Sequence, residues 1–337
     1  MNNLNINKHT DRDRPRATAP ARTRGGRWLA GAAVLGLGLG HGWAPAVQAD
    51  TFRLAHPGDS VIGVPFYVKS RNHDTLLDIG RQNQLGYQDM DQANPKVDIW
   101  VPGDGSDVLI PTFFVLPNTP RRGLVLNRPE MRLYYYPPDN PNEIQSYPIS
   151  IGREGWSTPL GTFSITKKVK DPTWTPPASI RAEHAASGDI LPAVVPAGPD
   201  NPLGQFAMRL SVPGYLIHGT NKPWGLGMQV SHGCIRMNNE GIEELFPQVS
   251  EGTVVTIVDQ PYKLGWLGND LYLEVHIDNE SKRKAARSVI PESVASADGL
   301  TMDWQAVERA VKENTGLPQL VGSRRSSADR LHLDMIF

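Results

Sequence analysis

“YLIHGTNKPWGLGMQVSHGCIRMNNEGIEELF”, residues 215 to 246, contains the only cysteine of this 337-residue chain, Cys234. The apolar run “YLI” predicts a strand that ends at His218. Asn239 is the expected cap of a following helix. The core face of that helix is predicted from residues at helical spacing, which are Ile242, Leu245, Phe246 and Val249. One thiol therefore stands between a predicted strand and a predicted helix.

Short extended runs separated by turns surround this segment from residue 122 onward. They include “GLVLNRPEMRLYYYP”, “IQSYPISIG”, “GTFSITKKV”, “QFAMRLSV” and “TVVTIVD”. Leu133 and Tyr135 alternate with their neighbours, which indicates a hairpin strand buried on one face. We therefore expect residues 119 to 260 to form a mainly β domain with a sandwich or barrel-like core.

A long proline-rich excursion interrupts these strands at residues 171 to 204. Loops of this length inside a compact domain usually serve a function or are disordered. Trp174, Ile180 and Leu191 are too apolar for a free tail. The excursion is therefore interpreted as a lid or cleft wall.

Residues 67 to 117 read as strand, helix, helix, strand. Thr75 is placed to cap a helix with Leu76, Ile79 and Leu85 on its apolar face, and a second helix stops near Asn94. We assign a small α+β domain to residues 50 to 118. Its “DTL”, “NP” and final “IP” elements resemble a LysM domain, which binds glycan chains, although His73 stands where that family usually has glycine. A structural domain that binds nothing is the alternative.

The first 49 residues have the pattern of a secretory signal. Seven basic and two acidic side chains precede the uncharged “WLAGAAVLGLGLG”, and Val47 and Ala49 are small residues at the spacing of a cleavage site. The apolar run falls short of the roughly 20 residues that span a bilayer. The expected mature chain therefore begins at Asp50 and has no transmembrane anchor.

Charge and cysteine content narrow the function further. The whole chain has a net charge of −1, so removal of seven basic and two acidic side chains leaves −6. No basic excess remains to indicate nucleic-acid binding. A single thiol in an exported chain forms no internal disulfide and is a candidate reactive group. Residues 261 to 337 are expected to be a C-terminal extension with one strand, “LYLEVHID”, and a helix over residues 302 to 315.

The neighbours of Cys234 are those that a thiol nucleophile requires. Such a nucleophile needs a base or positive charge nearby, hydrogen-bond donors for an oxyanion, and partial exposure. His218, His232 and Arg236 offer the first, and amides near Gly233 offer the second. Residue spacing alone does not choose between the two histidines. The alternative is that Cys234 is a small buried hydrophobic residue.

The motif “IHGTN”, followed by “SHGCIRM”, resembles the active-site motif of the L,D-transpeptidases, the YkuD-like family. The segments “TPLGTFSI”, “DPTWTPPASIR”, “LPAVVPAGPDNPLG” and “EGTVVTIVD” are similar to its exported Gram-negative branch, which carries LysM ahead of the catalytic domain. The resemblance covers about residues 60 to 280. It implies a YkuD-like β-rich catalytic domain in the periplasm.

The resemblance also implies roles for single residues. Cys234 would be the nucleophile, and His218 the base, with its other ring nitrogen oriented by the carbonyl of Gly219 or a neighbour. His232 is the second candidate base or a pocket residue. Ser231 and Gly233 are motif residues near the oxyanion site. The expected substrate-binding residues are Arg236, Thr220 and Asn221.

The implied reaction is acyl transfer on peptidoglycan. The thiol attacks the bond between diaminopimelate at stem position three and D-alanine at position four, and an amine resolves the thioester. The acceptor stays open: another stem's diaminopimelate, the lysine of an outer-membrane lipoprotein, or water, which would make the enzyme an L,D-carboxypeptidase. Stem peptides and glycan strands are the expected partners. No metal or cofactor is expected.

Three other classes of protein are alternatives to this interpretation. A peptidoglycan-binding protein would hold glycan and keep an inert cysteine. A zinc site would use His218, His232 and Cys234 as ligands, although no second cysteine or “HExxH” pattern supports it. A sortase-like enzyme would also be exported and β-rich, but “SHGC” behind a LysM module is not expected of one.

Overall fold

The computed structural model describes residues 50–277 and 283–324. The predicted signal segment, residues 1–49, lies outside the described residues, as does the end of the C-terminal extension from residue 325. All described residues belong to one compact unit. Within them, no helix combines the length and the apolar character needed to cross a membrane.

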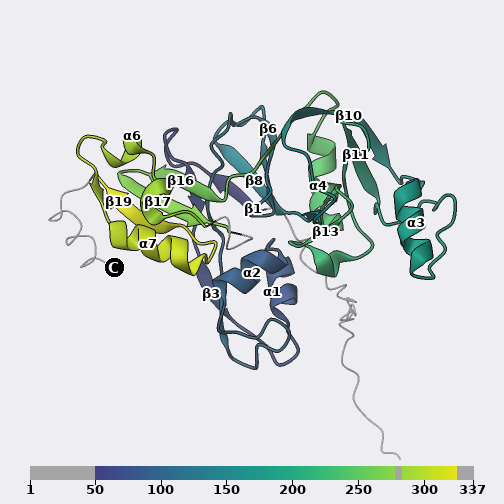
Figure 1. The fold of residues 1–337 in the computed structure, drawn as a ribbon, viewed down its shortest axis with the longest axis horizontal. Helices are drawn as coiled ribbons and strands as arrows, with labels where there is room; N and C mark the ends of the chain where they lie inside the picture. Colours follow the sequence, from purple (N-terminus) through teal and green to yellow (C-terminus); the bar gives the residue numbers. More distant parts are fainter. Residues whose placement is uncertain (1–49, 278–282, 325–337) are drawn as a thin grey trace, which may run out of the picture. The chain divides into compact units, whose positions relative to one another are not determined.

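A nine-stranded sheet forms the centre of the described chain (Figure 1). Its strand order is β1-β8-β7-β6-β15-β10-β11-β12-β14. The strands are β1 (Asp50–Arg53), β6 (Gly123–Asn127), β7 (Arg132–Tyr136), β8 (Glu143–Pro148), β10 (Gly161–Lys170), β11 (Phe206–Leu210), β12 (Leu216–His218), β14 (Ile235–Arg236) and β15 (Val254–Val258). The prediction of a mainly β fold is confirmed.

Strand β10 pairs with two different strands, so that the sheet curls around its core. Its first half, from Gly161 to Ser164, pairs with β15. Its second half pairs with β11 from Ile165 onward, with an irregularity between Ile165 and Lys167. A bulge of this kind bends a strand and increases its twist. Apolar side chains of β6, β7 and β8 then share one cluster with those of β11, β12 and β14. The barrel-like core expected from sequence is therefore present.

Helix α4 (Asn239–Gln248) fills part of that core, as Figure 1 shows beside β10 and β11. Its predicted cap is wrong by one residue. Asn238 is the cap, and its Oδ1 accepts a hydrogen bond from the Gly241 amide at 2.9 Å. The side chain of Asn239 is used elsewhere, because its Oδ1 accepts the amide of Thr220 at 2.9 Å. Ile242, Leu245 and Val249 are buried as expected.

The β7 strand is buried on both faces, so its prediction as a half-buried strand is wrong. Leu133 and Tyr135 pack in the cluster that β7 shares with β11, β12 and β14, and Tyr134 and Tyr136 pack in a second cluster. The second cluster also contains Leu76 and other side chains of the N-terminal module. This module covers the face that the alternation of residues assigned to solvent.

The N-terminal module comprises β2 (Val61–Gly63), β3 (Phe66–Lys69), α1 (Leu76–Gln82), α2 (Tyr87–Ala93), β4 (Asp107–Ile110) and β5 (Phe113–Val115). It contains the predicted strand, two helices and strand as β3, α1, α2 and β4, and β2 and β5 are additional strands. Thr75 caps α1 and exchanges hydrogen bonds with Asp78, as in a capping box. Strand β1 precedes this module in sequence but pairs with β8 of the central sheet. The LysM resemblance stays a prediction.

The excursion at residues 171–204 contains a helix that the sequence did not predict, α3 (Ala178–Ala186). Two features tie the excursion together. Trp174 and Val195 exchange backbone hydrogen bonds at 2.9 and 2.8 Å. The side-chain amide of Asn201 donates to the carbonyl of Pro172 at 2.8 Å. The excursion is therefore an ordered element.

The C-terminal extension forms its own four-stranded sheet in the order β16-β17-β19-β18. Its elements are β16 (Tyr262–Leu267), β17 (Asp270–Val275), α5 (Ala286–Val289), α6 (Glu292–Ala295), β18 (Thr301–Met302), α7 (Trp304–Glu313) and β19 (Gln319–Ser323). The predicted strand and helix correspond to β17 and α7. Helix α7 ends earlier than expected, because Asn314 takes the left-handed conformation that closes it.

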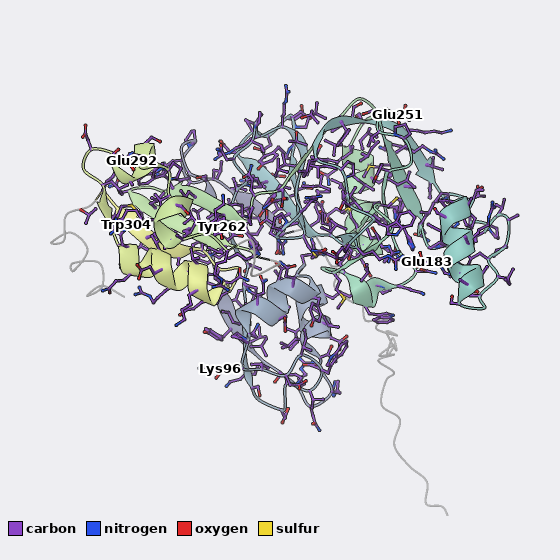
Figure 2. All side chains as sticks on the ribbon, in the orientation of Figure 1. Lys96, Glu183, Glu251, Tyr262, Glu292 and Trp304 are labelled. Atoms are coloured by element: carbon purple, nitrogen blue, oxygen red, sulfur yellow. The ribbon has the colours of Figure 1, made fainter. Side chains whose placement is uncertain are left out.

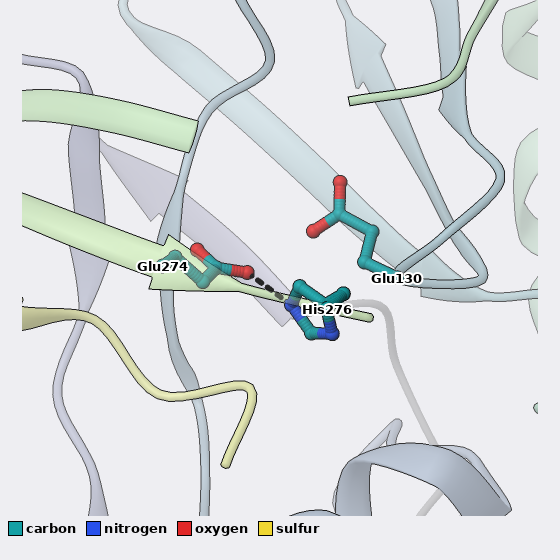
Figure 3. A group of neighbouring side chains, drawn as sticks. All are labelled: Glu130, Glu274 and His276. Atoms are coloured by element: carbon teal, nitrogen blue, oxygen red, sulfur yellow. Dashed lines mark hydrogen bonds and ion pairs between the residues drawn. The ribbon is translucent and has the colours of Figure 1, made fainter. Parts of the chain in front are cut away.

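A buried charge cluster joins the C-terminal sheet to the turn between β6 and β7 (Figure 3). The ammonium of Lys263 contacts the carboxylate of Glu130 and lies 2.9 Å from that of Glu274. The Nε2 atom of His276 lies 2.6 Å from Glu274. All four side chains are nearly inaccessible to solvent. The cluster connects the two regions, because Glu130 belongs to one of them and Lys263, Glu274 and His276 to the other. Removal of the cation alone would leave two buried carboxylates without their partner.

Candidate active site

The parallel pairing of β12 and β14 brings the motif residues together. Ile217 lies beside Ile235, and His218 lies beside Arg236. Continuing this register by one residue places Cys234 beside Leu216. Because side chains alternate along a strand, Cys234, Arg236 and His218 project from the same face of the sheet.

These three side chains line one cleft with a volume of about 870 Å³. The opposite wall is supplied by the excursion, through Trp174, Ile180 and Leu191. The prediction that the excursion forms a cleft wall is therefore confirmed. A mostly apolar wall facing a few convergent polar groups is typical of a small-molecule or peptide site.

His218 is buried at the end of β12 and oriented by its own backbone. Its Nδ1 lies 2.7 Å from the carbonyl oxygen of Gly219, which accepts a hydrogen bond from the protonated nitrogen. This is the contact expected of Gly219, and it leaves Nε2 without a proton. Burial, with a further contribution from the positive charge of Arg236, lowers the pKa of His218 to about 4. The imidazole is therefore neutral at neutral pH and can accept a proton.

Cys234 is half-buried, and its thiol is not bonded to His218. The Sγ atom lies 3.6 Å from the carbonyl oxygen of Gly214. Burial raises the pKa of the Cys234 thiol above its ordinary value, although the amide of Leu216 and the charge of Arg236 oppose this effect. Desolvation of the thiolate outweighs both favourable contacts, so the base and positive charge predicted near Cys234 do not ionise the thiol in the free site.

His232 lines the same cleft as the thiol, but its ring nitrogen contacts other side chains. Gly233 takes φ +100°, so the backbone turns between His232 and Cys234 instead of running extended. The Nε2 atom of His232 lies 2.9 Å from Glu183 and 3.1 Å from Arg153. The ring also packs edge-on against Trp156. The contacts of His232 are therefore those of a residue that links the excursion to the cleft.

Ser231 shapes the tight turn that carries the thiol. Its hydroxyl accepts the Gly233 amide at 3.1 Å and donates to the Cys234 carbonyl at 2.5 Å. The Gly233 amide is thus already engaged in this conformation. In the part of the chain that the structure describes, no hydrogen bond engages the amide of Cys234.

The three expected substrate-binding residues are divided between two cavities. Arg236 lines the main cleft, and no carboxylate of the described residues pairs with its guanidinium. Thr220 is buried, bonded to Asn239 and lines a smaller cavity of about 430 Å³. Asn221 lines both cavities, and its amide donates to the carbonyl of Asp200 at 3.0 Å.

Potential metal ligands converge at a different place. Among residues 50–277 and 283–324, the set of three such side chains whose ligand atoms lie within 4.8 Å of one another is Glu130, Glu274 and His276 (Figure 3). The ammonium of Lys263 already provides a cation between these carboxylates. His218, His232 and Cys234 do not form such a set, so this geometry gives the zinc alternative no support.

Sequence reasoning missed the residues that anchor the excursion. Glu183 on α3 (Figure 2) lies 2.6 Å from Arg153 and bridges to His232. Trp156 completes this contact from the segment before β10. Glu183 could have been noted as a charged residue in the excursion that the sequence predicts to be a cleft wall. No sequence pattern pairs it with Arg153, which lies 30 residues away.

The chain is similar to proteins of one enzyme family. The YkuD family model, described as the L,D-transpeptidase catalytic domain, matches residues 121–257. The “Probable L,D-transpeptidase ErfK/SrfK” of Escherichia coli (strain K12) is 40% identical over 286 residues, which is 82% of this chain and 92% of that protein. This chain belongs to the YkuD family of L,D-transpeptidases.

A second relative matches this chain over a similar share of its length. The “Probable L,D-transpeptidase YcfS” of the same strain is 40% identical over 311 residues, or 88% of this chain and 95% of that protein. Among solved structures, the catalytic domain of the Enterococcus faecium L,D-transpeptidase matches at 22% identity with a TM-score of 0.31. The match covers 42% of this chain and 100% of that chain. The family match corresponds to the predicted catalytic region at residues 119–260.

Proposed function

We propose that this L,D-transpeptidase acts through Cys234 on peptidoglycan stem peptides. The observation that carries the proposal is the shared cleft of the thiol, the imidazole of His218 with its unprotonated nitrogen, and the guanidinium of Arg236. These groups are a nucleophile, a proton acceptor and a carboxylate-binding cation. No single one of them would be enough, because buried cysteines and surface arginines are common.

The reaction follows from these groups in two transfers. Sγ attacks the carbonyl carbon between diaminopimelate at position three and D-alanine at position four, and the thiol proton passes to Nε2 of His218. The C–N bond then breaks, the imidazolium returns the proton to the departing nitrogen, and D-alanine leaves. A thioester to Cys234 remains. An acceptor amine attacks this thioester, and its proton returns through His218 to the released sulfur.

The negative charge that develops on the oxygen of the attacked carbonyl requires a hydrogen-bond donor. The free amide of Cys234 is the candidate, because Ser231 already binds the Gly233 amide. The guanidinium of Arg236 would hold a carboxylate of the stem peptide, since it has no acidic partner in the described part of the protein. Binding a planar carboxylate through two parallel hydrogen bonds would also orient the scissile carbonyl.

The proposal also includes the acceptor of the acyl group and the compartment in which the reaction takes place. Either the diaminopimelate of another stem or the lysine of an outer-membrane lipoprotein provides the amine that resolves the thioester. Transfer to water is the second candidate, since the cleft is open to solvent. The predicted signal segment supports a periplasmic site of action, and the N-terminal module is proposed to bind glycan as LysM domains do.

Product analysis tests the proposal. Mature protein is incubated with a disaccharide-tetrapeptide, with and without an amine acceptor, and products are identified by mass spectrometry. We expect D-alanine release by the wild type and none by Cys234→Ala. The matched control is Ser296→Ala, a hydroxyl replacement at the residue that follows α6 in the C-terminal extension, which should release D-alanine at the wild-type rate. Equal release by wild type and Cys234→Ala would overturn the proposal.

A further inference from the structure

The loop that joins the two catalytic strands is supported from outside the catalytic domain. This connecting loop, residues 219–230, runs from His218 to the turn at Ser231 and contains the 3-10 helix η1 (Pro223–Gly225) and most of β13 (Gln229–Ser231). The turn between α1 and α2, residues 84–87, lies against it (Figure 1). The contact joins segments that are about 140 residues apart in sequence, counted from Gly86 to Gly227.

The contact is formed by backbone against backbone. The amide of Tyr87 donates to the carbonyl of Leu226 at 2.9 Å. A Cβ atom added to Gly86 would lie 2.7 Å from the Cα of Gly227. Gly227 itself takes φ +80°, a conformation that favours glycine. Two glycines therefore allow an approach that any side chain would prevent.

The same turn also contacts the chain on the far side of the thiol. Asn238, which caps α4, donates from its side-chain amide to Oε1 of Gln84 at 3.3 Å. Arg81 on α1 lies 2.5 Å from Glu240 in the first turn of α4. The N-terminal module thus touches both the loop before the “SHGC” turn and the helix after it.

The module is held in place independently of this contact. Asp89 forms a buried ion pair with Arg132 of β7 at 2.6 Å and accepts the Gly86 amide at 2.8 Å. Gln88 donates to the carbonyl of Pro129 at 2.7 Å. Because these contacts anchor α2 to the central sheet, a steric change at Gly86 would displace the connecting loop rather than the module.

We infer that the α1–α2 turn is a positioning element for the catalytic cysteine and histidine. It sets the path of the loop between His218 and Cys234, and so the placement of their reacting atoms. The inference rests on the proposed function in one respect, because its first test measures the release of D-alanine. It assigns to the N-terminal module a role in catalysis that is separate from any binding of glycan.

Gly86→Ala tests this inference, with Gly58→Ala as the matched control. Gly86 has φ −92°, so alanine there brings no backbone strain and only the steric contact with Gly227. A Cβ atom at Gly58 would meet nothing within 4 Å. Release of D-alanine from the soluble disaccharide-tetrapeptide is measured at a temperature where circular dichroism shows all three full-length proteins to be folded.

We expect Gly86→Ala to lower kcat about tenfold or more, since displacement of reacting atoms by about 1 Å can cost about a hundredfold. KM should change less than kcat, because Gly86 itself does not line the substrate cleft and only Asn221 and Lys222 of the displaced loop do. Gly58→Ala should match the wild type in both. If Gly86→Ala does not fold, Gln84→Met removes the contact with Asn238 at similar volume and is expected to lower kcat as well.

Unchanged kcat in a folded Gly86→Ala, or an equal loss in Gly58→Ala, would overturn the inference. A rise in KM alone would also overturn it, because it would indicate a role in binding. Failure of the proposed function is recognised separately, since the wild type itself would then release no D-alanine. In that case the rate of Cys234 alkylation by iodoacetamide replaces the assay, and equal pH profiles for wild type and Gly86→Ala would contradict the inference.

Discussion

Cys234 and His218, the proposed nucleophile and base, are both uncharged in the free site at neutral pH. Burial lowers the pKa of His218 to about 4 and raises the pKa of the Cys234 thiol. In the proposed reaction, the thiol therefore loses its proton to His218 as it attacks the substrate carbonyl rather than before the attack. Such a site avoids the cost of holding a partly buried thiolate and imidazolium before the substrate arrives.

The low pKa of His218 predicts a specific pH dependence of stability. The unfolded chain binds a proton at this histidine near pH 6.5, whereas the folded protein binds it only near pH 4, so stability is lost as the pH falls between these values. Between pH 7 and 4.5 the wild type should lose about 2 kcal/mol more than His218→Gln, whose amide does not titrate. Urea unfolding of both proteins at the two pH values measures the difference.

Replacement of an exposed histidine provides the control for this prediction. His73 is exposed in the N-terminal module, so His73→Gln should lose as much stability between the two pH values as the wild type. A parallel loss in wild type and His218→Gln would show that His218 titrates normally in the folded protein, contrary to the prediction.

At the scale of single elements, α3 closes one side of the cleft. Glu183 lies 2.6 Å from Arg153 and 2.9 Å from His232, and these contacts connect the excursion to the “SHGC” turn. Hydrogen bonds from Arg153 and His232 lower the pKa of Glu183, so the carboxylate is charged at neutral pH. Because Glu183 is exposed, solvent weakens these contacts, and they are expected to guide α3 rather than to stabilise the fold.

Glu183→Gln should therefore raise KM a few-fold and leave kcat nearly unchanged. The substitution weakens the contacts that hold α3 against the cleft while leaving Cys234 and His218 in place. Steady-state kinetics with the disaccharide-tetrapeptide measure both constants. The control is Glu154→Gln, an exposed neighbour of Arg153 whose carboxylate has no partner in the described part of the chain. A fall in kcat with constant KM would contradict this role of α3.

At the scale of the whole molecule, the central sheet is fixed to both of its neighbours. The N-terminal module shares one apolar cluster with β6, β7 and β8. The C-terminal sheet is joined by Lys263 with Glu130 and Glu274, a cluster fully removed from solvent. The expected domain boundaries near residues 118 and 260 therefore lie within shared contacts, and we expect the described regions to unfold together.

Lys263→Met should destabilise the protein by about 3–5 kcal/mol, because two buried carboxylates lose their cation. Urea unfolding monitored by circular dichroism measures the loss. Lys96→Met is the matched control, since Lys96 is exposed (Figure 2) and should change stability by less than about 0.5 kcal/mol. An effect of Lys263→Met as small as that of the control would show that the cluster adds nothing to the contact with the C-terminal sheet.

Local sequence patterns were sufficient for several elements and for the motif residues. Thr75 at the start of α1, the extended run before His218, and the spacing of Ile242, Leu245 and Val249 in α4 depend on neighbours within one or two turns. Cap chemistry and hydrophobic spacing act over that distance, so they can be read directly. The resemblance of “SHGCIRM” to a family motif then identified the thiol and its candidate base.

By itself, therefore, the sequence determined the mainly β class, the order of elements in the N-terminal module, and Cys234 and His218 as candidates. Only the tertiary structure decided that both groups are neutral, that His232 turns toward Glu183, and that β7 is buried on both faces. The physical reason is that desolvation and packing depend on groups brought together from distant parts of the chain. The contact of Gly86 with Gly227 was also decided by the tertiary structure. Each glycine allows the close approach, but neither one identifies the other as its partner.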